Sequence, residues 1–176
     1  MSAELDVRMI RETTSEDAVT FTVAGCFCLF GDEVLLIQRQ REKPFALHWA
    51  IPAGKLEICE DVHRGMIREL NEEIGISINS SELISINDQV VLSDLGNFRF
   101  LSFALQLTRK PTLNLKHDEI RSSAWVDCRY ITKRRVVPFF WDGIADLQTW
   151  LTNSTIQPRL FPTPSAISSR GWGAVH

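Results

Sequence analysis

Three glutamates, Glu69, Glu72 and Glu73, lie within five consecutive positions of the chain. On a helix, residues at positions i, i+3 and i+4 project from a shared face. Carboxylates at these spacings repel each other, and in a cleft the repulsion raises their pKa values. A bound divalent cation reverses both penalties. Because the ligands would all be oxygens, the group favours Mg²⁺, or Mn²⁺, over zinc.

The helix that would carry these glutamates has signals at both ends. Asp61 is a predicted N-cap, and Gly75 is a predicted left-handed residue after the last turn. Between them, four aliphatic residues recur at helical spacing and predict the buried stripe, namely Met66, Ile67, Leu70 and Ile74. Arg68 is expected to pair with an acid. Glu60, in the preceding loop, is the candidate, and the contact would fix the loop against the helix.

The remaining elements alternate without a regular strand–helix–strand pattern. β-branched and aromatic runs predict strands at 18–30, 33–40, 83–92, 98–107 and 122–126. A helix is expected over 137–151, with Pro138 in its first turn and a stripe of Phe140, Ile144, Leu147 and Leu151. Residues 41–55 are expected to form a loop. This mixture predicts an α/β sandwich around a mixed β-sheet.

Length and composition predict one domain with two ends outside it. The 176 residues divide into an N-terminal leader at 1–17, a domain at 18–156 and a C-terminal tail at 157–176 that is rich in Pro, Ser and Gly. The tail lacks a continuous apolar stripe, so we expect it to be dispensable for folding. Trp172 is the exception, because a single tryptophan in a polar tail could dock on a second subunit, which leaves a homodimer open.

Charge and cysteine usage narrow the partners. A net charge of −3 and a pI of about 5.8 argue against a nucleic-acid-binding protein, including an RNA-decapping enzyme. The sequence has no apolar run long enough to span a membrane and no secretory signal at its N-terminus. Cys26 and Cys28 lie in an apolar strand without a second metal-binding pair, so we interpret them as buried, reduced thiols of a cytoplasmic protein.

The whole segment 54–76 resembles the Nudix box, G-x5-E-x7-R-E-U-x-E-E-x-G-U, in which U is a bulky aliphatic residue. Every specified position is filled, by Gly54, Glu60, Arg68, Glu69, Leu70, Glu72, Glu73, Gly75 and Ile76. A strand ending in "LLIQR" precedes the box and "HDEIRSSAWVD" follows it, so the resemblance covers about residues 18–152. It implies a Nudix-type α/β/α sandwich, with Gly54, Glu60, Arg68 and Gly75 in structural roles.

The resemblance to Nudix hydrolases also implies an activity, the Mg²⁺-dependent hydrolysis of a diphosphate linkage. By position, Glu69, Glu72 and Glu73 match the metal ligands of the helix, and the backbone carbonyl of Ala53 matches a further ligand. A carboxylate near the metal can deprotonate the attacking water. Glu72 or Glu69 is favoured for that step and Glu119 is the alternative.

Other matches concern the loop before the last strand and the phosphates. Asp118 is the near rival of Glu119. Arg39 lies 13 residues before Pro52, where related members carry an arginine on the substrate phosphates. Lys55 is a second candidate to bind the substrate.

The choice of substrate depends on weaker patterns. "WAIPAGKLE" is similar to members that act on nucleoside tri- and diphosphates and related small pyrophosphates. Members that hydrolyse ADP-ribose typically carry a proline about 15 residues beyond the box, and none lies between Gly75 and Arg109. Hydrolysis of ADP-ribose, of nucleotide sugars or of dinucleoside polyphosphates, and a non-catalytic nucleotide sensor, are the alternatives. Four aromatic residues are candidates to stack on a base, namely Phe45, Trp49, Phe139 and Trp141.

Three residues depart from the commonest pattern of the family. Cys59 stands where glycine often precedes the box glutamate, and Ala53 stands where glycine is usual. Gly65 replaces a frequent alanine inside the helix, at a cost of up to ~1 kcal/mol. None of these departures removes a carboxylate.

Overall fold

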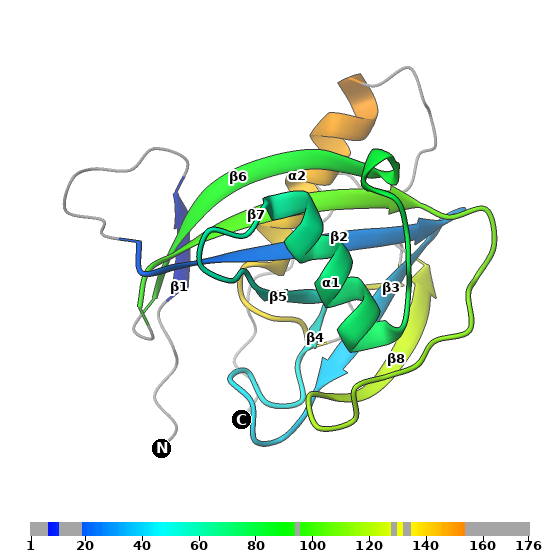
Figure 1. The fold of residues 1–176 in the computed structure, drawn as a ribbon, viewed down its shortest axis with the longest axis horizontal. Coiled ribbons are helices and arrows are strands. Elements are labelled where there is room, and N and C mark those ends of the chain that lie inside the picture. Colours follow the sequence, from blue (N-terminus) through cyan, green and yellow to red (C-terminus); the bar gives the residue numbers. More distant parts are fainter. Residues whose placement is uncertain (1–6, 11–18, 94–95, 128–129, 132–134, 154–176) are drawn as a thin grey trace.

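The computed structural model describes residues 7–10, 19–93, 96–127, 130–131 and 135–153 (Figure 1). The C-terminal tail at 157–176, with Trp172, therefore lies outside the described residues. The strands are β1 Val7–Ile10, β2 Phe21–Phe30, β3 Glu33–Arg39, β4 Trp49–Ala50, β5 Ala53–Lys55, β6 Leu83–Ser93, β7 Phe98–Gln106 and β8 Ile120–Asp127. The helices are α1 Val62–Ile74, the short 3₁₀ helix η1 Ser80–Glu82 and α2 Phe140–Asn153.

The described strands form one mixed sheet around β2. The main path of the sheet runs β1-β6-β7-β2-β3-β4, while β8 pairs with β3 and β5 pairs with β2. The pairing of β2 with β7 is parallel, and the other pairings between named strands are antiparallel. On its other edge, β2 pairs with β5 over residues 23–25 and with β3 at 29–30. The sheet therefore divides into two branches along this edge.

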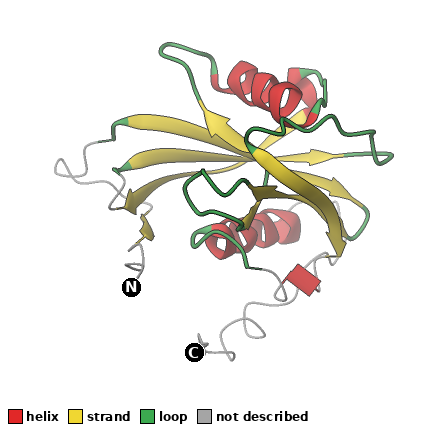
Figure 2. Cartoon of the chain, turned by 90° about the horizontal axis from the view of Figure 1, so that it is seen from below, coloured by secondary structure: helices red, strands yellow, loops and turns green. Residues whose placement is uncertain are grey.

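The two helices pack on opposite faces of the sheet (Figure 2). Successive residues of β2 and β3 face opposite sides, as a strand requires. Cys26, Cys28, Leu35 and Ile37 pack with Met66, Leu70 and Ile74 of α1. Phe27, Leu29, Val34 and Leu36 pack with Phe140, Ile144 and Leu147 of α2. The predicted α/β/α sandwich around a mixed sheet is therefore confirmed, and so is the burial of both cysteines.

The ends of α1 follow the sequence signals. The Asp61 carboxylate accepts a hydrogen bond from the backbone N–H of Arg64 at 3.0 Å. Gly75 adopts φ 74°, in the left-handed region, and Ile76 donates its backbone N–H to the carbonyl of Leu70 at 3.1 Å. A side chain at Gly75 would also collide with Asn114, because a Cβ would lie 2.8 Å from the Asn114 Cβ. Both caps satisfy backbone groups that a helix terminus leaves unpaired.

Several expected boundaries were wrong. β1 lies inside the segment 1–17, expected to be a leader, and pairs with β6. Residues 41–55, expected to be a loop, contain the short strands β4 and β5. α2 begins at Phe140 rather than at residue 137, because residues 135–137 run alongside Trp49 as a parallel β-bridge. Pro138 therefore precedes the helix.

Candidate functional site

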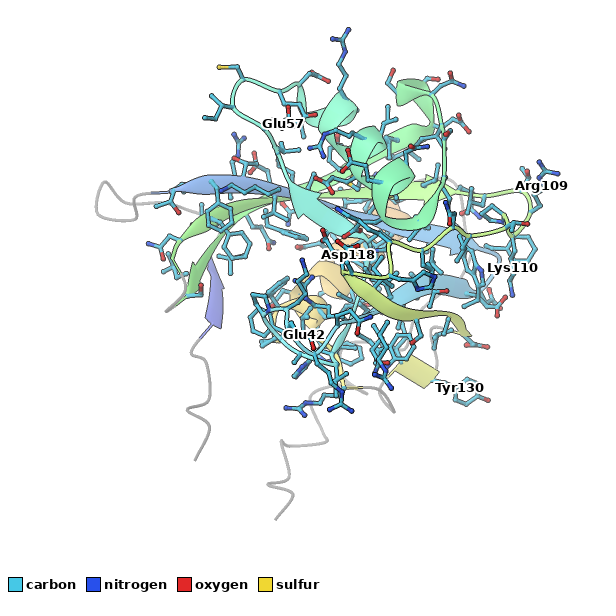
Figure 3. All side chains as sticks on the ribbon, turned by 60° about the horizontal axis from the view of Figure 1, so that its bottom comes forward. Glu42, Glu57, Arg109, Lys110, Asp118 and Tyr130 are labelled. Atoms are coloured by element: carbon cyan, nitrogen blue, oxygen red, sulfur yellow. The ribbon has the colours of Figure 1, made fainter. Side chains whose placement is uncertain are left out.

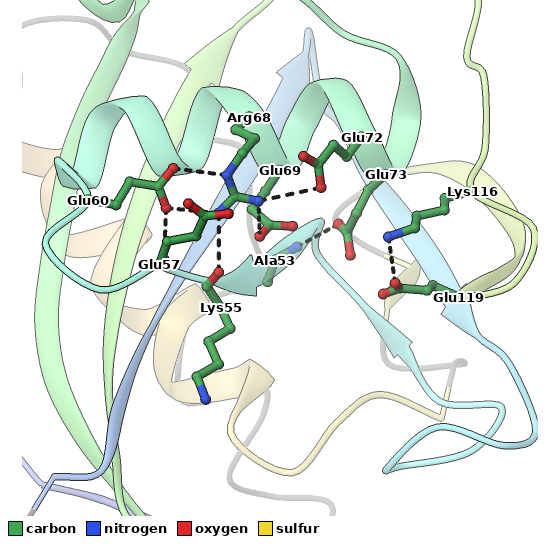
Figure 4. Close-up of polar contacts among 10 residues, drawn as sticks. All are labelled: Ala53, Lys55, Glu57, Glu60, Arg68, Glu69, Glu72, Glu73, Lys116 and Glu119. Atoms are coloured by element: carbon green, nitrogen blue, oxygen red, sulfur yellow. Dashed lines mark hydrogen bonds and ion pairs between the residues drawn. The ribbon is translucent and has the colours of Figure 1, made fainter.

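The acidic side of α1 lies against β5, and the two elements are joined by polar contacts (Figure 4). The backbone N–H of Ala53 donates to the Glu73 carboxylate at 2.9 Å. The Arg68 guanidinium donates to the carbonyl of Lys55 at 3.3 Å. Gly54, between these two residues, lies directly under Glu69, and a Cβ at Gly54 would be only 2.0 Å from the Glu69 carboxylate. Only glycine permits this approach, which explains its place at the start of the box.

Arg68 organises the acids on the outer side of the helix. Its guanidinium contacts both oxygens of Glu60, at 2.9 and 2.8 Å, so the expected pair is present and bidentate. It also contacts Glu69 at 2.8 Å and Glu72 at 3.4 Å. The hydrogen bond from Arg68 lowers the pKa of Glu60 to about 2. Glu60 in turn accepts the backbone N–H of Glu57 at 2.9 Å, which fixes the loop to the helix.

Gly65 makes room for this pair. A Cβ at Gly65 would lie 2.3 Å from a methyl group of Leu56 and 2.9 Å from a carboxylate oxygen of Glu60. The departure from the usual alanine therefore allows the loop to pack closely on α1. Cys59, in the same loop, has φ 63°, a conformation that favours glycine. The loop retains this conformation without the glycine.

The three glutamates of α1 differ in their surroundings. Glu73 is 3% exposed and Glu69 9%, whereas Glu72 is exposed. Burial raises the pKa of Glu73 to about 8, and the charges of Glu69 and Glu119 add to the effect. Burial also raises the pKa of Glu69, and Arg68 opposes that rise. The sequence placed these residues beside the buried stripe, but the structure places two of them within it.

Glu119 is brought to α1 by the segment that precedes β8. The backbone N–H groups of Asn114 and Lys116 donate to the last-turn carbonyls of Ile74 and Glu73, each at 2.9 Å. The Glu119 carboxylate then lies 2.7 Å from Lys116 and 3.7 Å from Lys43. Its rival Asp118 is exposed on the same segment (Figure 3). Of the two, Glu119 alone is among the described residues that line the adjacent cavity.

That cavity has a volume of about 470 Å³, and its lining combines a polar group of residues, the polar end, with an aromatic group, the aromatic end. Its polar end carries Arg39, Lys55 and Glu119 beside Ala53 and Gly54. The other end is lined by phenylalanines, of which the described ones are Phe21, Phe27, Phe45, Phe98, Phe100, Phe139 and Phe140. Arg39 ends β3 and Gly54 lies in β5, so the polar end takes residues from both branches of the divided sheet.

The predicted substrate residues are distributed unevenly around the cavity. Arg39 lines it and donates from Nε to the carbonyl of Pro44 at 2.8 Å. Lys55 lines it with Nζ 4.7 Å from the centroid of the Phe21 ring. Phe139 lines it as well. Trp49 does not belong to its lining; it packs against the core and donates its backbone N–H to the carbonyl of Arg135.

Sequence reasoning missed the lysines around Glu119 and two walls of the cavity. Lys43 and Lys116 do not belong to any motif that the sequence analysis used. Phe21 and Phe98 stack at 5.2 Å because β2 and β7 pair in parallel with these two residues in register. A pairing between residues so far apart in the chain leaves no periodic signal. A basic residue three positions before Glu119 was the only visible hint.

The donor set suits a hard divalent cation. The side chains of Glu69, Glu72 and Glu73 offer only oxygens, and two of them are buried close enough for one charge to raise the pKa of the other. Among the described residues, no three such side chains converge on one point. Arg68 holds Glu69 and Glu72, and the N–H of Ala53 holds Glu73. The residues fit the ion by chemistry, and binding would exchange these contacts for it.

Comparison with known families matches residues 20–147 to the NUDIX domain, which is more than half of the chain. The protein therefore belongs to the NUDIX domain family, and the resemblance drawn from the box is confirmed. Hydrolases of this family generally use divalent metal ions. No helix among the described residues has the length and apolar character needed to cross a membrane.

Two curated relatives match part of the chain. An 8-oxo-dGTP diphosphatase from Proteus vulgaris is 36% identical over 61 residues, which make up 35% of this chain and 54% of that protein. The 8-oxo-dGDP phosphatase NUDT18 of Danio rerio is 33% identical over 58 residues, which make up 33% of this chain and 18% of that protein. The matched segments thus span about half or less of these relatives.

Solved structures share the fold over most of the chain. An Ap4A hydrolase from C. elegans has a TM-score of 0.62 at 18% identity, covering 77% of this chain and 100% of that one. A bifunctional NMN adenylyltransferase/ADP ribose pyrophosphatase from Francisella tularensis, complexed with AMP and a manganese ion, has a TM-score of 0.62 at 22% identity, covering 74% and 41%. At these identities the likeness establishes the fold alone.

Proposed function

We propose that this protein hydrolyses a diphosphate linkage in a nucleoside tri- or diphosphate, or in a related small pyrophosphate, with Mg²⁺. One observation carries the proposal. Two carboxylates, Glu69 and Glu73, are buried side by side with raised pKa values, next to the polar end of a cavity. Glu69 is paired with Arg68, whereas the hydrogen-bond donor to Glu73 is the neutral backbone N–H of Ala53, and burial of a charge without a counter-ion is costly. A cation bound at the site removes that cost.

Glu69, Glu72, Glu73 and the backbone carbonyl of Ala53 would hold the ion. The N–H and C=O of one strand residue point to the same side, so the Ala53 N–H that reaches Glu73 implies that its carbonyl also faces α1. When bound, Mg²⁺ supplies positive charge for the phosphate oxygens and the leaving group. Mn²⁺ has the same preference for oxygen ligands and can replace it.

The proton of the attacking water needs a carboxylate, and we favour Glu69. It is buried, and it lies against Gly54 at the cavity wall, so its carboxylate is held beside the site. Glu72 is exposed and pairs with Arg68. Glu119 is the alternative because it lines the cavity, but two lysines contact its carboxylate.

The phosphates would lie at the polar end of the cavity. Arg39 and Lys55 both line that end, and their positive charges complement a polyphosphate chain. Arg39 is fixed by its bond to Pro44, so little side-chain freedom is lost when a phosphate binds. Lys116 and Lys43 add further positive charge beside Glu119. Together these residues offset the repulsion between the acidic helix and an anionic substrate.

A nucleoside tri- or diphosphate is favoured over ADP-ribose. The two curated relatives are named for action on 8-oxo-dGTP and 8-oxo-dGDP. The chain also lacks the downstream proline noted above. An exposed free thiol at Cys59 fits a reducing compartment, so we place the protein in the cytoplasm, acting on small molecules.

The test is a screen of phosphate and pyrophosphate release over nucleoside tri- and diphosphates, ADP-ribose and dinucleoside polyphosphates, with Mg²⁺ and with Mn²⁺. We expect release from simple nucleotides and none in excess chelator. Faster turnover of ADP-ribose would overturn the substrate class and keep the hydrolase. Nucleotide binding without release under both metals would favour the sensor instead.

A further inference from the structure

The aromatic end of the cavity is organised around one ring. Phe139, just before α2, lies 6.0 Å from Phe45, 6.1 Å from Phe98 and 5.7 Å from Phe100, between ring centroids. The planes of Phe45 and Phe98 are inclined to it by 80° and 76°. In such edge-to-face contacts the edge of one ring meets the face of the other. Phe139 is only half-buried, although it contacts three aromatic neighbours.

Phe45 reaches this group from an unfavourable backbone conformation. Its φ is 56°, and two residues later Leu47 has φ 60°. A bulky residue in this region is uncommon and its backbone is strained. Hydrogen bonds hold the segment in place. The backbone N–H of Leu47 donates to the carbonyl of Arg39 at 3.2 Å, and that of His48 donates to the carbonyl of Phe45 at 3.1 Å. The conformation directs the Phe45 ring against Phe139.

The same segment is tied to the polar end. The carbonyl of Pro44, the residue before Phe45, accepts the hydrogen bond from Arg39. Lys43 lies 3.7 Å from the Glu119 carboxylate. Lys43, Pro44 and Phe45 are successive in the chain. They therefore connect the aromatic end of the cavity with Arg39 and Glu119 of its polar end. A ligand that occupied both ends would need a planar apolar part and an anionic part joined over a short distance.

We propose that Phe45 and Phe139 are specificity-determining residues that receive the planar ring system of the substrate, while Arg39 and Lys55 receive its phosphates. The proposal rests on the proposed function and deepens it. It places a nucleobase, rather than a second sugar or a bare phosphate chain, at the aromatic end. The volume of about 470 Å³ is within the range of small-molecule sites, roughly 300–1,000 Å³.

Binding of two products separates the ring from the phosphate. AMP and ribose 5-phosphate carry the same sugar and phosphate, and neither contains a diphosphate linkage to hydrolyse. Their affinities are measured by calorimetry at one Mg²⁺ concentration for the wild-type chain, Phe139→Leu and Phe45→Leu. Leucine keeps apolar bulk and removes the ring. Phe103→Leu is the matched control, because Phe103 is a buried phenylalanine on the α1 face of the sheet.

Stacking on an aromatic side chain contributes on the order of a tenfold gain in affinity per base or more. We therefore expect wild type to bind AMP at least about tenfold more tightly than ribose 5-phosphate. Each cavity variant should weaken AMP binding by about that factor, leave ribose 5-phosphate unchanged and differ from Phe103→Leu. Equal wild-type affinities for the two probes, or an equal loss for both in the variants, would overturn the proposal.

The hydrolase assignment is tested separately, by phosphate release rather than by binding. Because these probes are not hydrolysed, their binding does not depend on turnover. A chain that prefers AMP but releases no phosphate from any nucleotide would support the ring site and overturn the hydrolase. A chain that hydrolyses inorganic tripolyphosphate as fast as a nucleoside triphosphate would keep the hydrolase and overturn the ring site.

Discussion

α1 and α2 pack on opposite faces of the same sheet, yet they bury different chemistry. α2 buries Phe140, Ile144 and Leu147, and its buried carboxylate, Asp146, accepts a hydrogen bond from Gln89. α1 buries Met66, Leu70 and Ile74 together with Glu69 and Glu73. The two acids lie close enough for the charge of Glu69 to raise the pKa of Glu73.

The difference shows which helix serves the fold and which serves the site. Burying an apolar side chain stabilises a protein by about 1.5–3 kcal/mol. The apolar contacts of α2 therefore stabilise the fold. Burying two like charges does the opposite. Natural sequences break such rules mainly at functional sites. The comparison therefore assigns stability to the buried face of α2 and chemistry to the acidic side of α1, and four measurements can break or sharpen it.

The largest effect is expected at the acids of α1. Glu73→Gln keeps the size of the side chain and removes its charge, so turnover with Mg²⁺ should fall by at least about two orders of magnitude while the chain stays folded. Steady-state hydrolysis of the best nucleotide from the screen is the measurement. The control is Glu42→Gln, because Glu42 is an exposed glutamate in the loop between β3 and β4. Near wild-type rates in Glu73→Gln would show that the proposed metal site is not on α1.

The corresponding experiment on α2 replaces a buried apolar side chain. Leu147 is fully buried against the sheet and does not line the cavity. Leu147→Ala should lower the free energy of unfolding by about 2–5 kcal/mol, because it removes apolar contacts and leaves a cavity. Urea denaturation measures the loss. At a temperature where the variant is folded, kcat/KM should stay near the wild-type value, and a large drop would show that α2 also serves the site.

The pH dependence of stability tests the burial of Glu73 directly. Its pKa is raised from 4.5 to about 8 in the folded protein, so folding favours its protonated form. That contribution is complete below pH 4.5 and is lost as the pH rises to about 8. In excess chelator, wild type should lose melting temperature over this window relative to Glu73→Gln, by on the order of 5 °C. Parallel curves for the two proteins would contradict the raised pKa.

The smallest effect is expected in the loop between β5 and α1. Cys59 is exposed and has φ 63°, where glycine has no steric penalty. Cys59→Gly should raise the free energy of unfolding by up to about 1 kcal/mol, since relief of the backbone strain is partly offset by the entropy of an unfolded glycine. Thermal unfolding of this variant beside Cys59→Ala isolates the backbone term. An Ala variant as stable as the Gly variant would show that the loop is not strained there.

Much of this molecule could be predicted locally. The caps of α1, its apolar stripe and the Arg68–Glu60 pair depend on residues within one helix and its loop, and the structure contains all of them. The strand centres followed from β-branched and aromatic runs. β1, β4 and β5 were missed because each has only two to four residues, too few for a periodic pattern. Their pairing partners, not their composition, make them strands.

The sequence by itself determined the family, the helix that carries the acids and the order of the box residues, because box spacing is a property of one continuous segment. Only the tertiary structure decided that Glu69 and Glu73 are buried while Glu72 is exposed, since that depends on where β5 lies against α1. The tertiary structure also chose Glu119 over Asp118 for the cavity and excluded Trp49 from its lining. The aromatic end exists because a parallel β2–β7 pairing and the start of α2 bring Phe21, Phe98 and Phe139 together. Those contacts join residues far apart in the chain, and no local pattern encodes them.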